Sequence, residues 1–118
     1  MDAQRRGKHA EDHAWQLLEA QGMRLLARNF RSRRGEIDLV VQDQDSIVFV
    51  EVRYRSQNRY GSATESVDQH KQARLIACAG YYLQLHPRAA QMPCRFDVIS
   101  VNGADGTTDW IKNAFDTG

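Results

Sequence analysis

The sequence predicts an α/β domain in which helices pack against a mixed central β-sheet. Three observations predict this class. Two segments place apolar residues at helical spacing, and several shorter segments have the β-branched or alternating pattern of strands. The segments follow the order helix, three strands, helix and two strands, which is typical of a sheet covered by helices. With 118 residues the chain is long enough for one core, so we expect a single domain over residues 1–118.

The charged residues are distributed unevenly along the chain. The composition is ordinary for a globular protein, with 42% hydrophobic and 26% charged residues and a net charge of +1. Residues 1–34 nevertheless hold eight Lys or Arg against four acids. This excess predicts either one basic patch or a solvated face, and the sequence leaves both open.

No segment of the sequence is typical of export or of membrane insertion. The N-terminus is polar and charged, and no long uncharged apolar run occurs, so we expect a cytoplasmic protein without a membrane span. Cys78 and Cys94 stand apart, without a CxxC pair. They fit buried or bystander thiols in a reducing compartment better than a disulfide or a zinc site.

The first helix is expected over residues 10–21. Ala14 and Leu18 follow helical spacing, and Gly22 is a suitable C-terminal stop. Glu11 shares a face with this apolar stripe. Its carboxylate is therefore either a solvated residue at the margin of the stripe or a third ligand directed toward the strands that follow.

A first strand over residues 23–30 leads into a basic turn. Arg31, Arg33 and Arg34 come directly before Gly35. Guanidinium groups bind phosphate bidentately, so these arginines suit a nucleic-acid backbone. They would serve equally as counter-charges for the acids that follow.

Residues 34–55 predict a β-hairpin that carries acidic side chains. Apolar runs over 37–41 and 47–52 flank a polar break. The acids that accompany the two apolar runs are Glu36, Asp38 and Glu51. An acid inside a β-branched strand is costly to bury unless it is paired or holds a metal.

The length of the turn decides which acids meet. A two-residue turn at residues 44–45 pairs Val41 with Val48. The same register places Asp38 opposite Glu51, on one face of the hairpin. A turn one position earlier also leaves both acids on one face, whereas an odd-length loop without a bulge would separate them.

Two interpretations of these acids remain open. Two carboxylates close together beside a cation make a hard-oxygen site for Mg²⁺ or Mn²⁺. Alternatively, the hairpin lies at a sheet edge and its acids pair with Arg53 or Arg55 across the strands. Spacing alone favours neither.

A second helix follows a polar connection over residues 57–64, which is expected to form a loop. The helix is expected to begin after Asp68 or Ser66 and to end near Leu85. Lys71 lies in its first turn, where the helix dipole disfavours a cation. This position suits contact with an anion, although an exposed lysine there costs little.

The last third of the chain completes the pattern. Residues 88–93 are expected to form a loop and residues 94–101 a strand. Residues 102–107 contain two glycines and are expected to form a turn. Residues 109–115 are expected to be a strand or a docked tail.

Four elements of the sequence together resemble the YraN-like family of small uncharacterised bacterial proteins. They are Glu11 with Ala14 in the first helix, NFRSRRGEIDLV at 29–40, VFVEVRYR at 48–55, and VDQHKQARL with RFDVISV at 67–75 and 95–101. That family is similar to the PD-(D/E)xK nuclease superfamily. The resemblance implies a restriction-endonuclease-like mixed β-sheet flanked by helices, related to Holliday-junction resolvases and archaeal tRNA-splicing endonucleases.

The resemblance also implies roles for individual residues. Asp38 matches the first acid of the superfamily motif and Glu51 the second, while Glu11 matches the helix-borne acid of resolvase-type members. Together they would hold Mg²⁺ or Mn²⁺. Arg53 stands where the motif has lysine; it stays protonated and cannot act as a base. Lys71 is a candidate replacement if its helix points toward the site.

The function expected from this resemblance is that of a Mg²⁺-dependent endonuclease-like protein acting on DNA, with branched or damaged DNA as candidate substrates. The alternative is a non-catalytic nucleic-acid-binding domain that retains the nuclease fold. A third hypothesis is a protein-interaction adaptor. The residues expected to contact nucleic acid are Arg31, Arg33, Arg34, Arg55 and Lys71. Superfamily nucleases often dimerise, so a homodimer is a further expectation.

Overall fold

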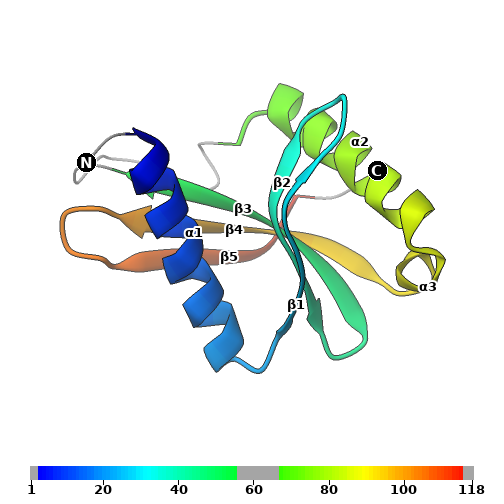
Figure 1. Ribbon diagram of the computed structural model, residues 1–118, viewed down its shortest axis with the longest axis horizontal. Helices are drawn as coiled ribbons and strands as arrows, with labels where there is room; N and C mark the ends of the chain where they lie inside the picture. The colour runs from blue at the N-terminus through cyan, green and yellow to red at the C-terminus, as the bar shows by residue number, and fades with distance from the viewer. Residues whose placement is uncertain (1–2, 56–66, 116–118) are drawn as a thin grey trace.

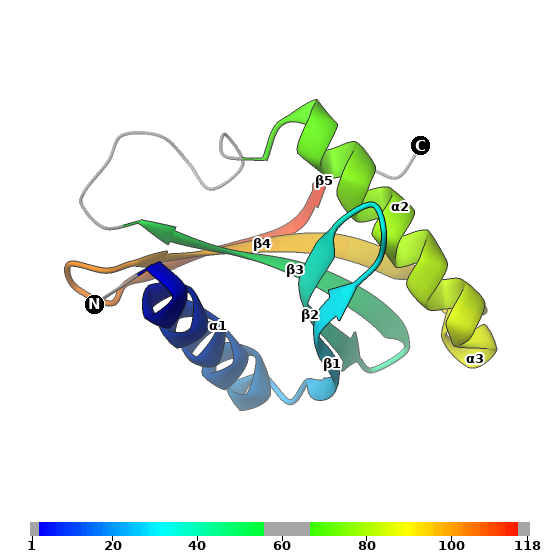
Figure 2. The same cartoon turned by 45° about the horizontal axis from the view of Figure 1, so that its top comes forward.

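A five-stranded mixed sheet forms the centre of the protein, in a computed structural model that describes residues 3–55 and 67–115. Helix α1 covers one face of the sheet and helix α2 the opposite face (Figures 1 and 2). The helices and strands, in chain order, are α1 (Ala3–Ala20), β1 (Arg24–Arg31), β2 (Glu36–Asp43), β3 (Ser46–Arg55), α2 (Gln69–Leu85), α3 (Pro87–Ala90), β4 (Cys94–Asn102) and β5 (Thr108–Phe115).

The strands lie in the sheet in the order in which they follow one another in the chain. The pairs β1–β2, β2–β3 and β4–β5 are antiparallel, whereas β3 and β4 are parallel. A parallel pair needs a crossover between its strands, and α2 with α3 lies within that connection. The predicted mixed sheet flanked by helices is therefore confirmed, and this architecture is compatible with a restriction-endonuclease-like fold.

Each face of the sheet has its own apolar cluster. The cluster beneath α1 comprises Ala10, Ala14, Leu18, Met23, Leu39, Val41, Val48, Val50, Ile99 and Val101. The cluster beneath α2 comprises Ile37, Val40, Ile47, Phe49, Val67, Leu75, Cys78, Ala79, Tyr82, Ala89, Phe96 and Val98. Residues 47–50 of β3 alternate between the two clusters, as expected for a strand buried on both faces.

Helix α1 ends as predicted but begins seven residues earlier than predicted. Gly22 has a φ of 85°, and its N–H donates to the Glu19 carbonyl while the Met23 N–H donates to the Leu18 carbonyl. These two bonds form the Schellman motif expected at a C-terminal glycine. The start was misplaced because residues 3–9 lack apolar periodicity, although alanine, glutamine and arginine are good helix formers.

Helix α2 begins at the predicted cap. The Asp68 side chain accepts the Lys71 N–H at 2.8 Å. The loop expected over 88–93 is partly wrong, because α3 forms there: Pro87 not only ends α2 but also starts a new turn of helix at its first position. The loop expected over 57–64 and the alternative cap Ser66 lie outside the described residues.

The predicted outer strands and the predicted cysteine environments agree closely with the structure. Strand β1 lies one residue further along than expected, and residues 109–115 belong to strand β5 rather than to a docked tail. Cys78 is buried and Cys94 is exposed. No helix in the described ranges has the length and apolarity needed to cross a membrane.

Candidate active site at the fork between β2 and β3

Strands β2 and β3 diverge immediately before the acidic residues. The predicted turn at residues 44–45 and the predicted Val41–Val48 pair are both present, but the ladder ends at Leu39 and Val50. Beyond this point β3 continues its pairing with β4 through residue 55. In Figure 1 the turn of the β1–β2 hairpin rises away from the sheet toward α2. The two strands therefore form a fork.

Asp38 occupies the base of this fork. Its Oδ2 atom accepts the backbone N–H of Val52 at 2.8 Å. Because the regular ladder has already ended, this carboxylate satisfies an amide that would otherwise lack a partner on that side of β3. The same bond holds the Asp38 side chain between the strands, at the centre of the acidic group.

Four acids surround the fork. Glu11 on α1, Glu36 on β2 and Asp38 each place one carboxylate oxygen within 4.8 Å of the other two. Glu51 on β3 is only 7% exposed, and its charge, like those of Glu11 and Glu36, acts on Asp38. Of the three acids predicted from the sequence, Glu11 and Asp38 belong to this 4.8 Å group together with Glu36. Glu51 is not part of that group, although it lines both cavities that Asp38 lines.

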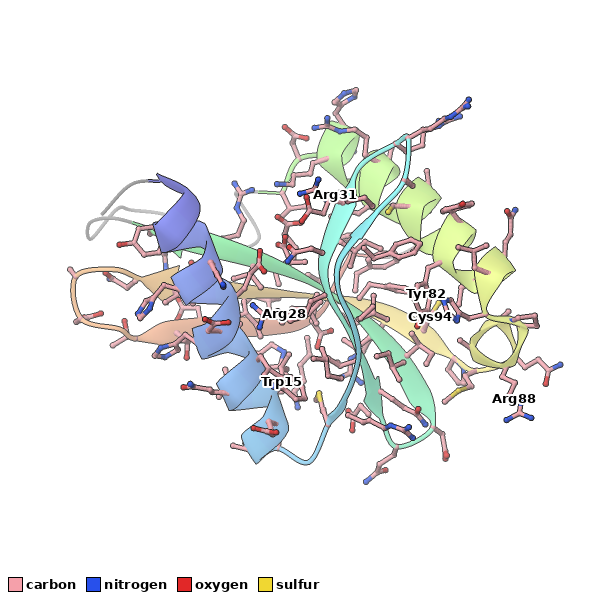
Figure 3. All side chains as sticks on the ribbon, viewed as in Figure 1. Trp15, Arg28, Arg31, Tyr82, Arg88 and Cys94 are labelled. Atoms are coloured by element: carbon pink, nitrogen blue, oxygen red, sulfur yellow. The ribbon has the colours of Figure 1, made fainter. Side chains whose placement is uncertain are left out.

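The outer acids each have a cationic partner. Arg28 contacts Glu11 at 3.4 Å and lies between α1 and the β1–β2 hairpin (Figure 3). Arg31 contacts Glu36 at 3.4 Å, on the side toward α2. Both pairs are partly solvent-exposed, so their contribution to stability is small and their role is to balance charge.

Glu51 has two cations beside it. The Lys71 Nζ atom lies 3.0 Å from Glu51 Oε1, and an Arg53 guanidinium nitrogen lies 3.9 Å from the same oxygen. The first turn of α2 therefore directs Lys71 at the acidic site, where it contacts an anion, as its position in the sequence suggested. Lys71 is closer to the acid than Arg53, which occupies the position of the motif lysine.

Asp38 is the acid of this group without a cationic partner among the described residues. Burial and the neighbouring charge of Glu51 raise its pKa to about 8. The hydrogen bond from Val52 lowers this pKa, while the charges of Glu11 and Glu36 raise it further. A positive charge at the fork would relieve this repulsion, and hard divalent cations prefer carboxylate oxygens of this kind.

Two cavities open onto the fork, and both are lined by Asp38, Glu51 and Lys71. The cavity beside α1 has a volume of about 340 Å³; its other lining residues are Gly7, Ala10, Glu11, Val52, Arg53 and Tyr54. The cavity beside α2 has a volume of about 300 Å³; its other lining residues are Gly35, Glu36, Arg74 and Leu75. The fork is thus open toward both helices.

The arginines predicted to contact nucleic acid do not form one group. Arg31, Arg33 and Arg34 lie at the β1–β2 turn, where they line a third cavity. Arg55 instead pairs with Asp109 on β5, with 2.8 Å between guanidinium nitrogen and carboxylate oxygen. In the described parts of the chain, Arg55 lines neither cavity at the fork.

Sequence reasoning did not place three residues in the site. Glu36 was recognised as an acid of the hairpin, but its convergence with Glu11 requires the divergence of β2 from β3, which periodicity does not reveal. Arg28 lies in the first strand, and its pairing with Glu11 depends on how α1 packs. Arg74 follows Lys71 by three residues on α2, and this helical spacing was a usable signal.

The similarity of this chain to known proteins covers the residues of the site. The sequence profile of the uncharacterised protein family UPF0102 matches residues 10–101. The chain belongs to UPF0102. A UPF0102 protein of Pseudomonas entomophila (strain L48) is 51% identical over 113 residues, covering 93% of this chain and 92% of that relative. Another, from Nitrosococcus oceani, is 46% identical over 112 residues, covering 93% and 90%.

Every candidate site residue predicted from the sequence lies within the matched residues 10–101 of the family. Among solved structures, this chain is similar to SfsA of Pyrococcus furiosus in complex with Ca²⁺, with a TM-score of 0.41 and 14% identity. The alignment covers 94% of this chain, which spans 64% of that one.

Proposed function

We propose that this protein is a divalent-metal-dependent endonuclease-like protein that acts on DNA in the cytoplasm. Branched and damaged DNA are its candidate substrates. The observation that carries the proposal is the arrangement at the fork, where three other carboxylates act on Asp38 and this central acid has no cationic partner among the described residues. Such an arrangement is costly without a ligand, and sites with perturbed acids are candidates for function.

The residues at the fork fit Mg²⁺ or Mn²⁺. All the candidate ligands are carboxylates, which these ions prefer over nitrogen or sulfur. Asp38, Glu11 and Glu36 offer oxygens within 4.8 Å of one another, and Glu51 stands on the other strand of the fork. When bound, such an ion polarises a phosphate and lowers the pKa of an attacking water.

Lys71 takes the role of the missing motif lysine in this proposal. Its ammonium group is held at 3.0 Å by Glu51, where it can orient a water and stabilise charge that develops on a phosphate oxygen. Arg53 stays protonated and holds the phosphate by its planar guanidinium. With arginine in place of the motif lysine, Arg53 therefore binds the phosphate and Lys71 takes part in the reaction.

The DNA backbone would approach over the basic turn. Arg33 and Arg34 are exposed, and neither forms an ion pair with any residue that the structure describes. Phosphates bound there release counterions, so affinity should fall steeply with salt. A homodimer, in which each copy cuts one strand, is a further prediction from the resemblance.

The proposal is tested by a cleavage assay on linear, supercoiled and branched DNA with Mg²⁺, Mn²⁺ or EDTA. Nicking that requires the metal and falls by about 100-fold or more in Asp38→Asn and Glu51→Gln supports it. Glu19→Gln is the matched control, because Glu19 is an exposed acid on the same helix as Glu11. No metal binding at millimolar concentration, or cleavage that ignores Asp38 and Glu51, would contradict the proposal.

A non-catalytic nucleic-acid-binding domain is the second candidate function. The observation that favours it is Arg53, which stands beside Glu51 where the superfamily motif has a lysine. Salt-dependent DNA binding without cleavage in either metal would support this candidate over the first. If the affinity for DNA is unchanged after replacement of Arg31, Arg33 and Arg34 by Ala, the basic turn does not bind DNA in either candidate function.

A further inference from the structure

The basic turn and α2 enclose a third cavity that the proposed cleavage site does not use. It has a volume of about 310 Å³ and is lined by Arg31, Ser32, Arg33, Arg34, Ala77 and Tyr81. Tyr81 is 44% exposed, although large aromatic rings are usually covered in a monomer. Its ring centroid lies 5.9 Å from that of Phe30, and the two ring planes are tilted by 34°.

The cavity combines cations with an apolar wall. Arg33 and Arg34 supply two guanidinium groups that no described residue neutralises, while Ala77 and Tyr81 supply a small apolar floor and a ring. A nucleotide has the same two parts, a phosphate and a flat base. Proteins that bind single strands pair a positive groove with aromatic rings on which bases stack.

The turn that carries the arginines is held rigidly against α2. The buried Cys78 thiol contacts the carbonyls of Phe30 and Gly35 at 3.8 Å and 3.5 Å. The Ser32 N–H donates to the Gly35 carbonyl at 2.9 Å and closes the turn. The cavity is therefore a preformed feature of the fold, which lowers the cost of ordering it around a ligand.

A continuous line of residues on α2 connects this cavity with the acidic fork. Lys71, Arg74, Cys78 and Tyr81 follow one another at spacings of three or four, so they lie along one face of the helix. Ten residues of helix span about 15 Å. A strand of nucleic acid covers that distance with roughly four nucleotides at duplex spacing.

From this geometry we infer that the cavity binds one unpaired nucleotide of a single-stranded segment, with the base stacked on Tyr81 and its phosphate on Arg33 and Arg34. The inference rests on the nucleic-acid role proposed above and specifies its substrate: DNA with a single-stranded region a few nucleotides from the cleaved bond. A paired base is held within the duplex stack and cannot lie against the tyrosine. The site therefore selects frayed, flapped or branched DNA over a blunt duplex.

The test is fluorescence anisotropy in EDTA with a 12-nucleotide single strand and a blunt duplex of the same sequence. Binding in EDTA does not depend on cleavage. We expect the wild-type protein to prefer the single strand, and Tyr81→Leu to reduce that preference by about fivefold to 150-fold. Leucine keeps the apolar contact with Phe30 but removes the stacking face, and Tyr81→Phe should restore the preference.

Leu85→Ala is the matched control, because Leu85 is 51% exposed on the same helix, one turn beyond Tyr81. It should leave the preference unchanged. Replacing Arg33 and Arg34 with Ala should reduce the slope of log affinity against log salt for the single strand by about 1.4. Equal losses on single strand and duplex in Tyr81→Leu, or no loss on either, would overturn the inference.

The outcomes separate this inference from the nuclease proposal. A preference that depends on Tyr81, in a protein that cleaves no DNA with either metal, supports the cavity and contradicts the nuclease. Metal-dependent cleavage without any preference for single-stranded regions has the opposite meaning: the fork functions, and the cavity does not bind a base.

Discussion

Asp38 lies at the centre of the proposed metal site, and its ionisation destabilises the folded protein when no metal is bound. Its carboxylate completes the hydrogen bonding of Val52, yet three neighbouring acids oppose its ionisation. The cations at the fork pair with the outer acids instead. In the metal-free protein, the repulsion on Asp38 therefore acts against folding, and a group whose titration differs between folded and unfolded states makes stability depend on pH.

The first prediction concerns this pH dependence. The pKa of Asp38 is raised from 3.8 to about 8 in the folded protein, so the folded state binds its proton more tightly than the unfolded state does. Stability is then lost as pH rises between those values. In EDTA, Asp38→Asn should raise the melting temperature at pH 9 and by much less at pH 5, because Asn accepts from Val52 without a charge. Thermal unfolding of both proteins across this range measures the effect.

Glu19→Gln, an exposed substitution, should give the same melting temperature as the wild type at each pH. A melting temperature that falls in Asp38→Asn at pH 9 would contradict the account of the fork as a strained acidic group.

The second prediction separates the two cations beside Glu51. Lys71→Ala should lower the rate of metal-dependent cleavage by about 100-fold or more, since a positioned acid, base or cation contributes on that order. Arg53→Lys should raise the rate, because it restores the ammonium group of the superfamily motif. Single-turnover cleavage, with the protein in excess over the DNA and above the dissociation constant of the complex, measures the rate of cleavage apart from binding.

Lys71→Arg is the control for charge alone, because it keeps the ion pair with Glu51 but not the compact ammonium group. A rate in Lys71→Ala equal to that of the wild type would exclude Lys71 from the reaction.

Helices and strands explain how these side chains come to face one another. The first turn of α2 is fixed by Asp68, whose carboxylate accepts the Lys71 N–H at 2.8 Å. The residue that caps the helix is thus bonded to the residue that reaches Glu51. We therefore predict that Asp68→Ala lowers stability by about 1 kcal/mol through the lost cap. It should also weaken cleavage, because the first turn frays and Lys71 loses its position.

Asp68→Asn is the matched variant for this prediction, because asparagine caps helices nearly as well as aspartate. Chemical denaturation and the cleavage rate should both stay close to wild type in Asp68→Asn. Loss of activity in Asp68→Asn with unchanged stability would mean that the charge of Asp68, rather than its cap, matters.

Much of the fold was predictable because its signals are local. The Asp68 cap, the Gly22 stop and the two-residue turn at 44–45 each depend on a few neighbouring residues. The register of that turn also predicted that Asp38 and Glu51 lie on the same side of the hairpin, and both line the same two cavities although the ladder ends before it pairs them. The fork itself could not be predicted from this register, because the divergence of β2 beyond Leu39 depends on packing against both helices. Glu36 and Arg28 therefore enter the site without a sequence signal.

At the scale of the whole molecule, the fully buried acid Asp97 has the opposite character to Asp38. Asp97 on β4 is fully buried and accepts from the Trp110 Nε1 atom at 3.0 Å and from the Asn113 N–H at 2.9 Å. Arg95 donates to it at 3.1 Å and also to Asp43 at 3.1 Å. This network joins β2, β4 and β5, so it ties the far edge of the sheet to the hairpin that carries the site.

The same substitution of Asp by Asn should therefore have opposite effects at Asp97 and at Asp38. Asp97→Asn leaves Arg95 facing a neutral group and weakens bonds from β5, so we expect a loss of about 2–4 kcal/mol in the free energy of unfolding. Asp38→Asn at pH 9 should raise the same quantity. Urea denaturation in EDTA measures both, with Asp45→Asn at the exposed hairpin turn as a control expected to change it by less than about 0.5 kcal/mol. If both substitutions shifted stability in the same direction, the distinction between a satisfied structural acid and an unsatisfied acid awaiting a cation would fail.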